Sequence, residues 1–204
     1  MPLRLFGFSG LWMTLALLSA CAPGRDPAER RHEPVILSPT EGVAIPFPGH
    51  PTRRLATADS NQAGLSLFEI VIPASSAGAP PHIHTHEDEF FYVRAGTPTF
   101  MANGERKTIG PGGFILLPRD SLHAVWNRAD QEAILLIGTS RGQFDDFFDA
   151  VALEARQSKA RTPEEIGQIM FRLGAERGVT IRMDQVPRDV ADLYGLPGGA
   201  ADVP

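Results

Sequence analysis

Between residues 35 and 140, hydrophobic positions come in short runs that turn-forming residues separate. Short strands in succession, with no helical stretch between them, predict an antiparallel sandwich or barrel. The Asn103-Gly104 pair is the strongest sequence signal of a two-residue hairpin. The clearest runs, rich in β-branched, aromatic or leucine residues, are residues 65–72, 89–94, 114–117 and 133–138.

After residue 141 the hydrophobic spacing becomes that of helices. Apolar residues at i, i+3, i+4 and i+7 predict an amphipathic helix over residues 143–156. Thr162 and Glu165 form a capping box with a proline at the first helical position, so a second helix should run from there to near Gly178. We expect the apolar faces of both helices to cover the outer face of the sheet. Residues 187–204 have little apolar content, which predicts a loose tail.

The first twenty residues predict a signal peptide. Arg4 comes before an apolar run at residues 5–18, which is shorter than the about 20 residues that span a membrane. The run ends in small residues before Cys21, which resembles the lipobox of bacterial lipoproteins. That resemblance implies cleavage before Cys21 and its lipidation. The alternatives are an ordinary signal peptide that ends near Ala20, or a buried free cysteine.

The lipobox resemblance also implies a location at the bacterial cell envelope, on the periplasmic side. Ala22, rather than aspartate, after the cysteine implies the outer membrane. Residues 21–34 combine prolines and charges without apolar periodicity, which predicts a flexible tether behind the lipid anchor. The predicted organisation is a signal peptide at 1–20, this tether, a barrel at 35–140 and a helical C-terminal extension with a loose tail at 141–204.

Composition and charge exclude several classes of protein. The 20 glycines and 18 prolines among 204 residues are too many for a helical bundle. A formal net charge of −5 gives no basic footprint, so we expect no nucleic-acid partner. The single cysteine excludes an internal disulfide framework.

Three histidines and a glutamate have the spacing of metal ligands. On a strand, His82 and His84 would point to the same face. Glu89 has the opposite parity and joins them only if the chain turns or bulges at residues 85–88. His123 lies in another strand-like stretch and would complete a set of nitrogen and oxygen ligands for a divalent transition metal.

Each of these residues has an alternative interpretation. The histidines could be core residues with hydrogen-bond partners, and Glu89 a surface charge at a strand end. His86 is left open as a loop residue, a partner of a metal ligand or a proton shuttle.

The parity of the strand at Glu89 gives a further expectation. If Glu89 points inward, then Phe91 and Val93 line the interior, while Phe90 and Tyr92 point outward. Outward aromatic side chains would need cover from a partner subunit or from the C-terminal helices.

The spacing of these residues resembles the two sequence motifs of the cupins. The first motif reads His82-Ile83-His84, four residues, Glu89, six residues and Gly96, and the second reads Gly112, five residues, Pro118-Arg119-Asp120, two residues, His123, three residues and Asn127. Two positions depart from the pattern: Gly78 is closer to the histidine pair than usual, and Asp120 replaces a glycine. Aspartate tolerates turn conformations, so this departure concerns the turn more than the metal.

The resemblance is strongest to small single-domain cupins of the quercetin-dioxygenase-like group. It implies an all-β antiparallel jelly-roll barrel with one metal on His82, His84, Glu89 and His123. Cupins of this kind are often homodimers. Since the site has no thiolate, Fe, Mn, Ni, Cu and Zn all fit as the divalent ion.

Three functions are compatible with such a site. The first is a dioxygenase-like oxidoreductase, in which a small chelating substrate is activated for attack by O2 and Glu89, if it detaches from the metal, acts as the base. Phe91 and Phe114, as interior aromatics, would suit an aromatic substrate. The second is an envelope protein that binds a small ligand or metal without turnover. The third is a metal-dependent isomerase or decarboxylase, which would need no O2.

Overall fold

Residues 32–197 are described by a computed structural model. The predicted signal peptide, Cys21, most of the predicted tether and residues 198–204 lie outside the described residues. Within residues 32–197, no helix combines the length and the apolar character that crossing a membrane requires.

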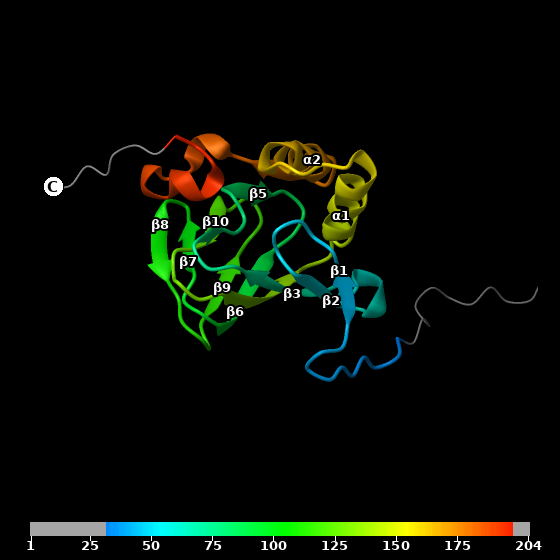
Figure 1. The fold of residues 1–204 in the computed structure, drawn as a ribbon. Helices are drawn as coiled ribbons and strands as arrows, with labels where there is room; N and C mark the ends of the chain where they lie inside the picture. Colours follow the sequence, from blue (N-terminus) through cyan, green and yellow to red (C-terminus); the bar gives the residue numbers. More distant parts are fainter. Residues whose placement is uncertain (1–31, 198–204) are drawn as a thin grey trace, which may run out of the picture. The chain divides into compact units, whose positions relative to one another are not determined.

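Two antiparallel sheets form the barrel (Figure 1), which confirms the predicted all-β jelly-roll fold. The first sheet has the order β1 (Val43–Ile45), β2 (Thr52–Ala56), β3 (Ser66–Ile72), β11 (Ala133–Thr139), β6 (Glu89–Ala95) and β9 (Phe114–Leu117). The second has the order β12 (Val179–Ile181), β5 (His82–His84), β10 (His123–Asn127), β7 (Thr99–Ala102) and β8 (Glu105–Thr108), and β4 (Ser76–Ala77) also pairs with β10.

Strand β6 alternates between the core and solvent as its parity predicts. Glu89, Phe91 and Val93 are buried, whereas Tyr92 is 41% exposed. Strand β3 has the same alternation, with Phe68 and Ile72 in the core. The inward face of the first sheet is therefore mainly apolar, with Thr52, Ser66 and Thr139 as its small polar residues and Glu89 as its carboxylate, at one end of β6.

The predicted turn chemistry is confirmed at two positions. Asn103 and Gly104 join β7 to β8, and both have a positive φ, 48° and 88°, as a tight primed hairpin turn requires. Asp120, which replaces the glycine of the second motif, has a φ of 66°. The backbone there does adopt the left-handed conformation, and aspartate tolerates it.

The C-terminal extension begins with two helices, α1 (Phe147–Ser158) and α2 (Pro163–Glu176), beside the barrel (Figure 1). Thr162 and Glu165 make the capping box that the sequence predicts. The expected packing surface was wrong for α1, because its Phe148 ring lies 4.9 Å from that of Phe68, on the buried face of β3. Helix α1 therefore packs on the buried face of the first sheet and extends the barrel core.

The predicted loose tail is corrected for residues 187–197. Two 3-10 helices, η3 (Met183–Gln185) and η4 (Arg188–Tyr194), follow β12, and a third, η2 (Ala58–Ser60), lies between β2 and β3. Val190 is buried beside Trp126 and Met101, and Arg128 pairs with Asp192. A few apolar contacts and ion pairs suffice to hold this segment on the second sheet, although it has no helical periodicity.

Candidate metal centre

The predicted metal ligands are brought together from three strands. His82 and His84 lie on β5, and His82 is directly opposite His123 of the neighbouring strand β10. Glu89 is the first residue of β6 in the facing sheet, so residues 85–88 cross from one sheet to the other. On one continuous strand, Glu89 would face away from His84, because the two are an odd number of residues apart. The crossing, rather than a bulge in one strand, is what lets Glu89 face the histidines. One ligand atom from each residue lies within 4.8 Å of the others, and all four residues are buried.

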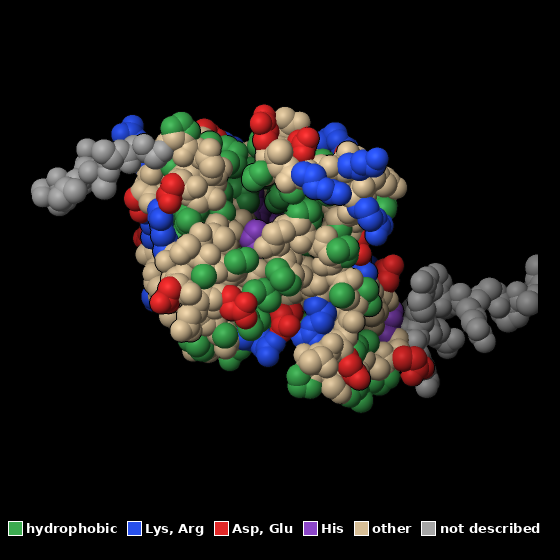
Figure 2. All heavy atoms as spheres, viewed as in Figure 1, with side chains coloured by type: hydrophobic (Ala, Val, Ile, Leu, Met, Phe, Trp, Pro, Cys, Tyr) green, Lys and Arg blue, Asp and Glu red, His purple; other side chains and the backbone are tan. Residues whose placement is uncertain are grey.

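One carboxylate oxygen faces three imidazoles. Glu89 Oε2 is 2.8 Å from Nε2 of His123, 3.6 Å from that of His84 and 3.9 Å from that of His82. Histidine side chains are visible in a hollow near the middle of the face in Figure 2. The four side chains thus converge on one small volume.

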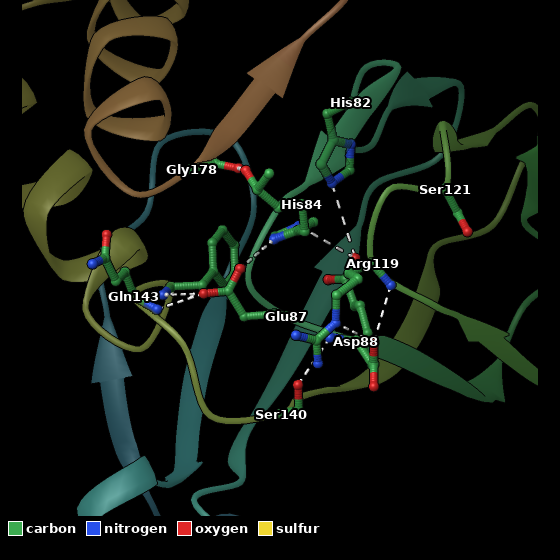
Figure 3. A network of polar contacts seen from close by, with 12 residues as sticks. His82, His84, Glu87, Asp88, Arg119, Ser121, Ser140, Gln143 and Gly178 are labelled. Carbon is green, nitrogen blue, oxygen red and sulfur yellow. Dashed lines mark hydrogen bonds and ion pairs between the residues drawn. The ribbon is translucent and has the colours of Figure 1, made fainter.

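The outer nitrogen of each imidazole faces a hydrogen-bond acceptor. His82 Nδ1 is 2.7 Å from the Pro80 carbonyl, and His123 Nδ1 is 2.9 Å from the Ser121 carbonyl. His84 Nδ1 is 3.2 Å from Glu87 Oε2 (Figure 3). For His82 and His84 these acceptors favour a proton on Nδ1 and leave the Nε2 lone pair directed at the shared volume, which is the arrangement of metal-bound histidine. Nε2 of His123 donates to Glu89 Oε2 in this structure, and a bound ion would take the place of that proton.

The donor set fits a divalent metal ion. Among the described residues, His84 Nε2 is the buried side-chain polar atom that has no hydrogen-bond partner. An unsatisfied buried nitrogen is costly unless something else occupies its lone pair. Three neutral imidazoles and one carboxylate would leave a charge of +1 on a divalent ion, with coordination positions free for a substrate.

Burial and mutual contact shift the pKa values of the cluster. Burial, together with the neighbouring His123 and His84, holds the pKa of His82 well below its usual value of 6.5. Burial opposes ionisation of Glu89, but the hydrogen bond with His123 and the nearby histidines outweigh it and lower its pKa to about 2. Glu89 is therefore a carboxylate at neutral pH and His82 is neutral, as metal ligands must be. Burial opposes ionisation of His84, but Glu87 and Glu89 outweigh it and raise its pKa, so a bound ion would compete with a proton there.

Two neighbouring polar residues lie outside the cluster. His86 is exposed and packs beside Gly178. Asp88 Oδ1 accepts hydrogen bonds from the backbone amide and from Nε of Arg119 (Figure 3), at 3.0 and 3.2 Å. Neither side chain is part of the group of potential metal ligands.

One expected interior aromatic is on the outside. Phe114 is 60% exposed on β9, so it does not line the interior, whereas Phe91 is buried. Phe144 is the aromatic side chain next to the cluster, with its ring 4.8 Å from that of His84. It comes from the segment before α1, which the sequence assigned only to helix packing.

Sequence reasoning also missed Glu87, which it treated as part of a polar turn. Its carboxylate is completely buried and contacts His84, Gln143 and Phe144. Burial opposes ionisation, yet hydrogen bonds from His84 and from two backbone amides hold its pKa below the usual value. The only sequence signal of a role for Glu87 was its position between the predicted ligands His84 and Glu89.

Comparison with known proteins agrees with the motifs. Residues 68–138 match the family model described as the cupin domain. Over these residues the chain is similar to the cupins. No curated protein matches the chain.

Solved structures that resemble this chain cover about half of it. A predicted oxalate decarboxylase from Thermotoga maritima has 16% identity and a TM-score of 0.45, over 52% of this chain and 98% of that one. KdgF from Halomonas sp. has 19% identity and a TM-score of 0.40, over 46% and 81%. The polyketide cyclase RemF from Streptomyces resistomycificus has 26% identity and a TM-score of 0.39, over 50% and 69%.

Proposed function

We propose that the protein is a metal-dependent enzyme that acts on a small chelating substrate, with a dioxygenase-like oxidation as its reaction. The observation that carries the proposal is the convergence of three buried imidazoles and one buried carboxylate, with the inward nitrogen of His84 left without a partner. A bound divalent metal would supply a Lewis acid that lowers the pKa of an enol or hydroxyketone.

The chain's own residues supply orientation and a proton acceptor. Oε2 of Glu89 lies among the three imidazoles, and once detached from a bound metal this carboxylate can take a proton from a substrate hydroxyl. Phe144 forms an apolar wall beside His84. Phe144 is itself buried and stacks on Phe147, so this contact helps to hold the His84 ring in place.

Oxygen consumption tests this reaction. The full-length protein, loaded separately with Fe, Mn, Ni, Cu or Zn, should consume O2 with at least one enol or hydroxyketone of a substrate panel. Turnover in anaerobic buffer would instead indicate an isomerase or a decarboxylase. Tight metal or ligand binding without product under either atmosphere would indicate a binding protein.

We also propose that Cys21 is lipidated and that the protein is anchored at the periplasmic side of the outer membrane. The support is the apolar run at residues 5–18 and the small residues before Cys21. Stable anchoring needs more than one acyl chain. Mass spectrometry of the membrane fraction should therefore find a chain that begins at a multiply acylated Cys21, and Cys21→Ser should release the protein from membranes. An unmodified cysteine would contradict the anchor.

We propose further that the protein forms a homodimer through an apolar patch on the first sheet. Tyr92, Phe114 and Leu116 are 41%, 60% and 60% exposed, and β9 is an edge strand. The C-terminal helices leave these side chains exposed, so a second copy is the remaining cover. We expect the Phe114→Ser plus Leu116→Ser variant to be monomeric by light scattering, whereas the control Phe171→Ser, on α2, stays dimeric. A monomeric unmutated protein would contradict the dimer.

A further inference from the structure

Glu87 is a buried carboxylate that holds two parts of the chain together. Its residue exposure is 0%. Oε2 accepts from His84 Nδ1, and Oε1 accepts from the backbone amides of Gln143 and Phe144 (Figure 3). Both oxygens therefore accept hydrogen bonds. Oε2 binds the strand that carries His84, and Oε1 binds the segment just before α1.

Gly142 makes room for this carboxylate. A Cβ atom at this position would overlap Oε1, Cδ and Cγ of Glu87. Since Glu87 is enclosed, its side chain has no free space into which it could retreat. A glycine at residue 142 is therefore part of the Glu87 contact.

The C-terminal extension packs directly against the histidine strand. Strand β12 pairs with β5, with Val179 opposite His84 and Ile181 opposite His82. Phe144 contacts the His84 ring edge to face at 4.8 Å. The extension thus provides a strand, a ring and two amides around one predicted metal ligand.

We propose that Glu87 is a positioning residue that fixes the ring of His84, and that residues 142–144 of the extension hold Glu87 for this task. The inference rests on the proposed metal site. A carboxylate behind the outer nitrogen of a histidine keeps the proton there, orients the ring and makes the inner nitrogen a better ligand. His82 and His123 use backbone carbonyls for the same purpose, so His84 alone depends on a side chain held by the extension.

Metal affinity of the full-length protein tests the proposal. In competition with a chelator, Glu87→Ala should weaken Co(II) or Zn(II) binding by about 10- to 100-fold, the usual effect of losing such a partner. Glu87→Gln should weaken it less, because its amide can accept from His84 but then presents NH2 to the two backbone amides. The d–d absorption bands of bound Co(II) should shift in both variants.

A matched control separates positioning from stability. The Glu165 carboxylate also accepts hydrogen bonds from two backbone amides, those of Arg161 and Thr162, but it lies at the start of α2, outside the metal cluster. Glu165→Gln should lower the thermal midpoint while leaving metal affinity and the Co(II) spectrum unchanged. Gly142→Ala should reproduce the affinity loss of Glu87→Ala, although Gly142 contacts no predicted ligand.

Two outcomes would overturn the proposal. The first is a folded Glu87→Ala variant with the metal affinity and Co(II) spectrum of the unmutated protein. This result would refute the positioning role of Glu87 but not the proposed metal site. The second is failure of the unmutated protein to bind any of these metals, which would overturn the proposed function as well. Circular dichroism of the metal-free variants establishes that each is folded.

Discussion

Replacing His82 and His123 together by alanine is expected to abolish metal binding. The two residues face each other across β5 and β10, and their rings lie 4.1 Å apart. The double variant would keep only His84 and Glu89, and two ligands cannot hold a divalent ion against solvent and buffer. We expect the metal content, measured by mass spectrometry of the purified protein, to fall from about one ion per chain to below about 0.1.

The matched control for this experiment is His86→Ala. His86 is close in sequence to both strand histidines, yet it is exposed and is not in the cluster. Its removal should leave the metal content unchanged. If the double variant retained its metal, or if His86→Ala lost it, the assignment of the ligands would be refuted.

The cluster could be predicted because its members are few, chemically distinctive and placed by strand periodicity. A two-residue spacing puts His82 and His84 on one face, and both are buried. The position of Glu89 was harder, because periodicity works only within one strand. Its side chain reaches the cluster from the other sheet. No local sequence pattern shows which way a side chain points after the four residues that cross between the sheets.

The contribution of the extension could not be predicted for a similar physical reason. Helical spacing indicates that Phe144 and Phe148 are buried, but not what they are buried against. Strand β12 has only three residues, and its partner β5 lies almost a hundred positions earlier in the chain. Glu87 looks like a surface residue until the backbone of residues 143–144 is placed over it. Burial of a charge depends on such distant contacts.

Asn127, the last residue of the second motif, also stabilises the barrel. The residue is completely buried, and its Nδ2 donates to the carbonyls of Ile72, Pro73 and Gln131, at 3.2, 3.0 and 2.7 Å. Its Oδ1 accepts from the Ala129 amide at 3.1 Å. The side chain thus closes the turn between β10 and β11 onto the end of β3.

Asn127→Ala is expected to lower the free energy of unfolding by about 3 kcal/mol, because it takes a hydrogen-bond partner from one buried carbonyl, two part-buried carbonyls and one part-buried amide. For a chain of this size the thermal midpoint should fall by about 6–12 °C. Asn127→Asp is a sharper test, since aspartate keeps the acceptor for Ala129 but turns a negative oxygen toward the three carbonyls. It should destabilise at least as much as alanine, whereas a role through Oδ1 alone would leave it near the unmutated protein.

Neither variant at Asn127 should change the metal content of the folded protein. Asn127 and His123 are four residues apart on β10, which separates them by about 13 Å along an extended strand. Metal analysis well below the thermal midpoint should therefore still find about one ion per chain. If the variants lose stability but keep the metal, the role of Asn127 is to stabilise the barrel. Metal lost at a temperature where the chain is folded would instead place Asn127 in the support of His123, and would contradict the separation of the two roles.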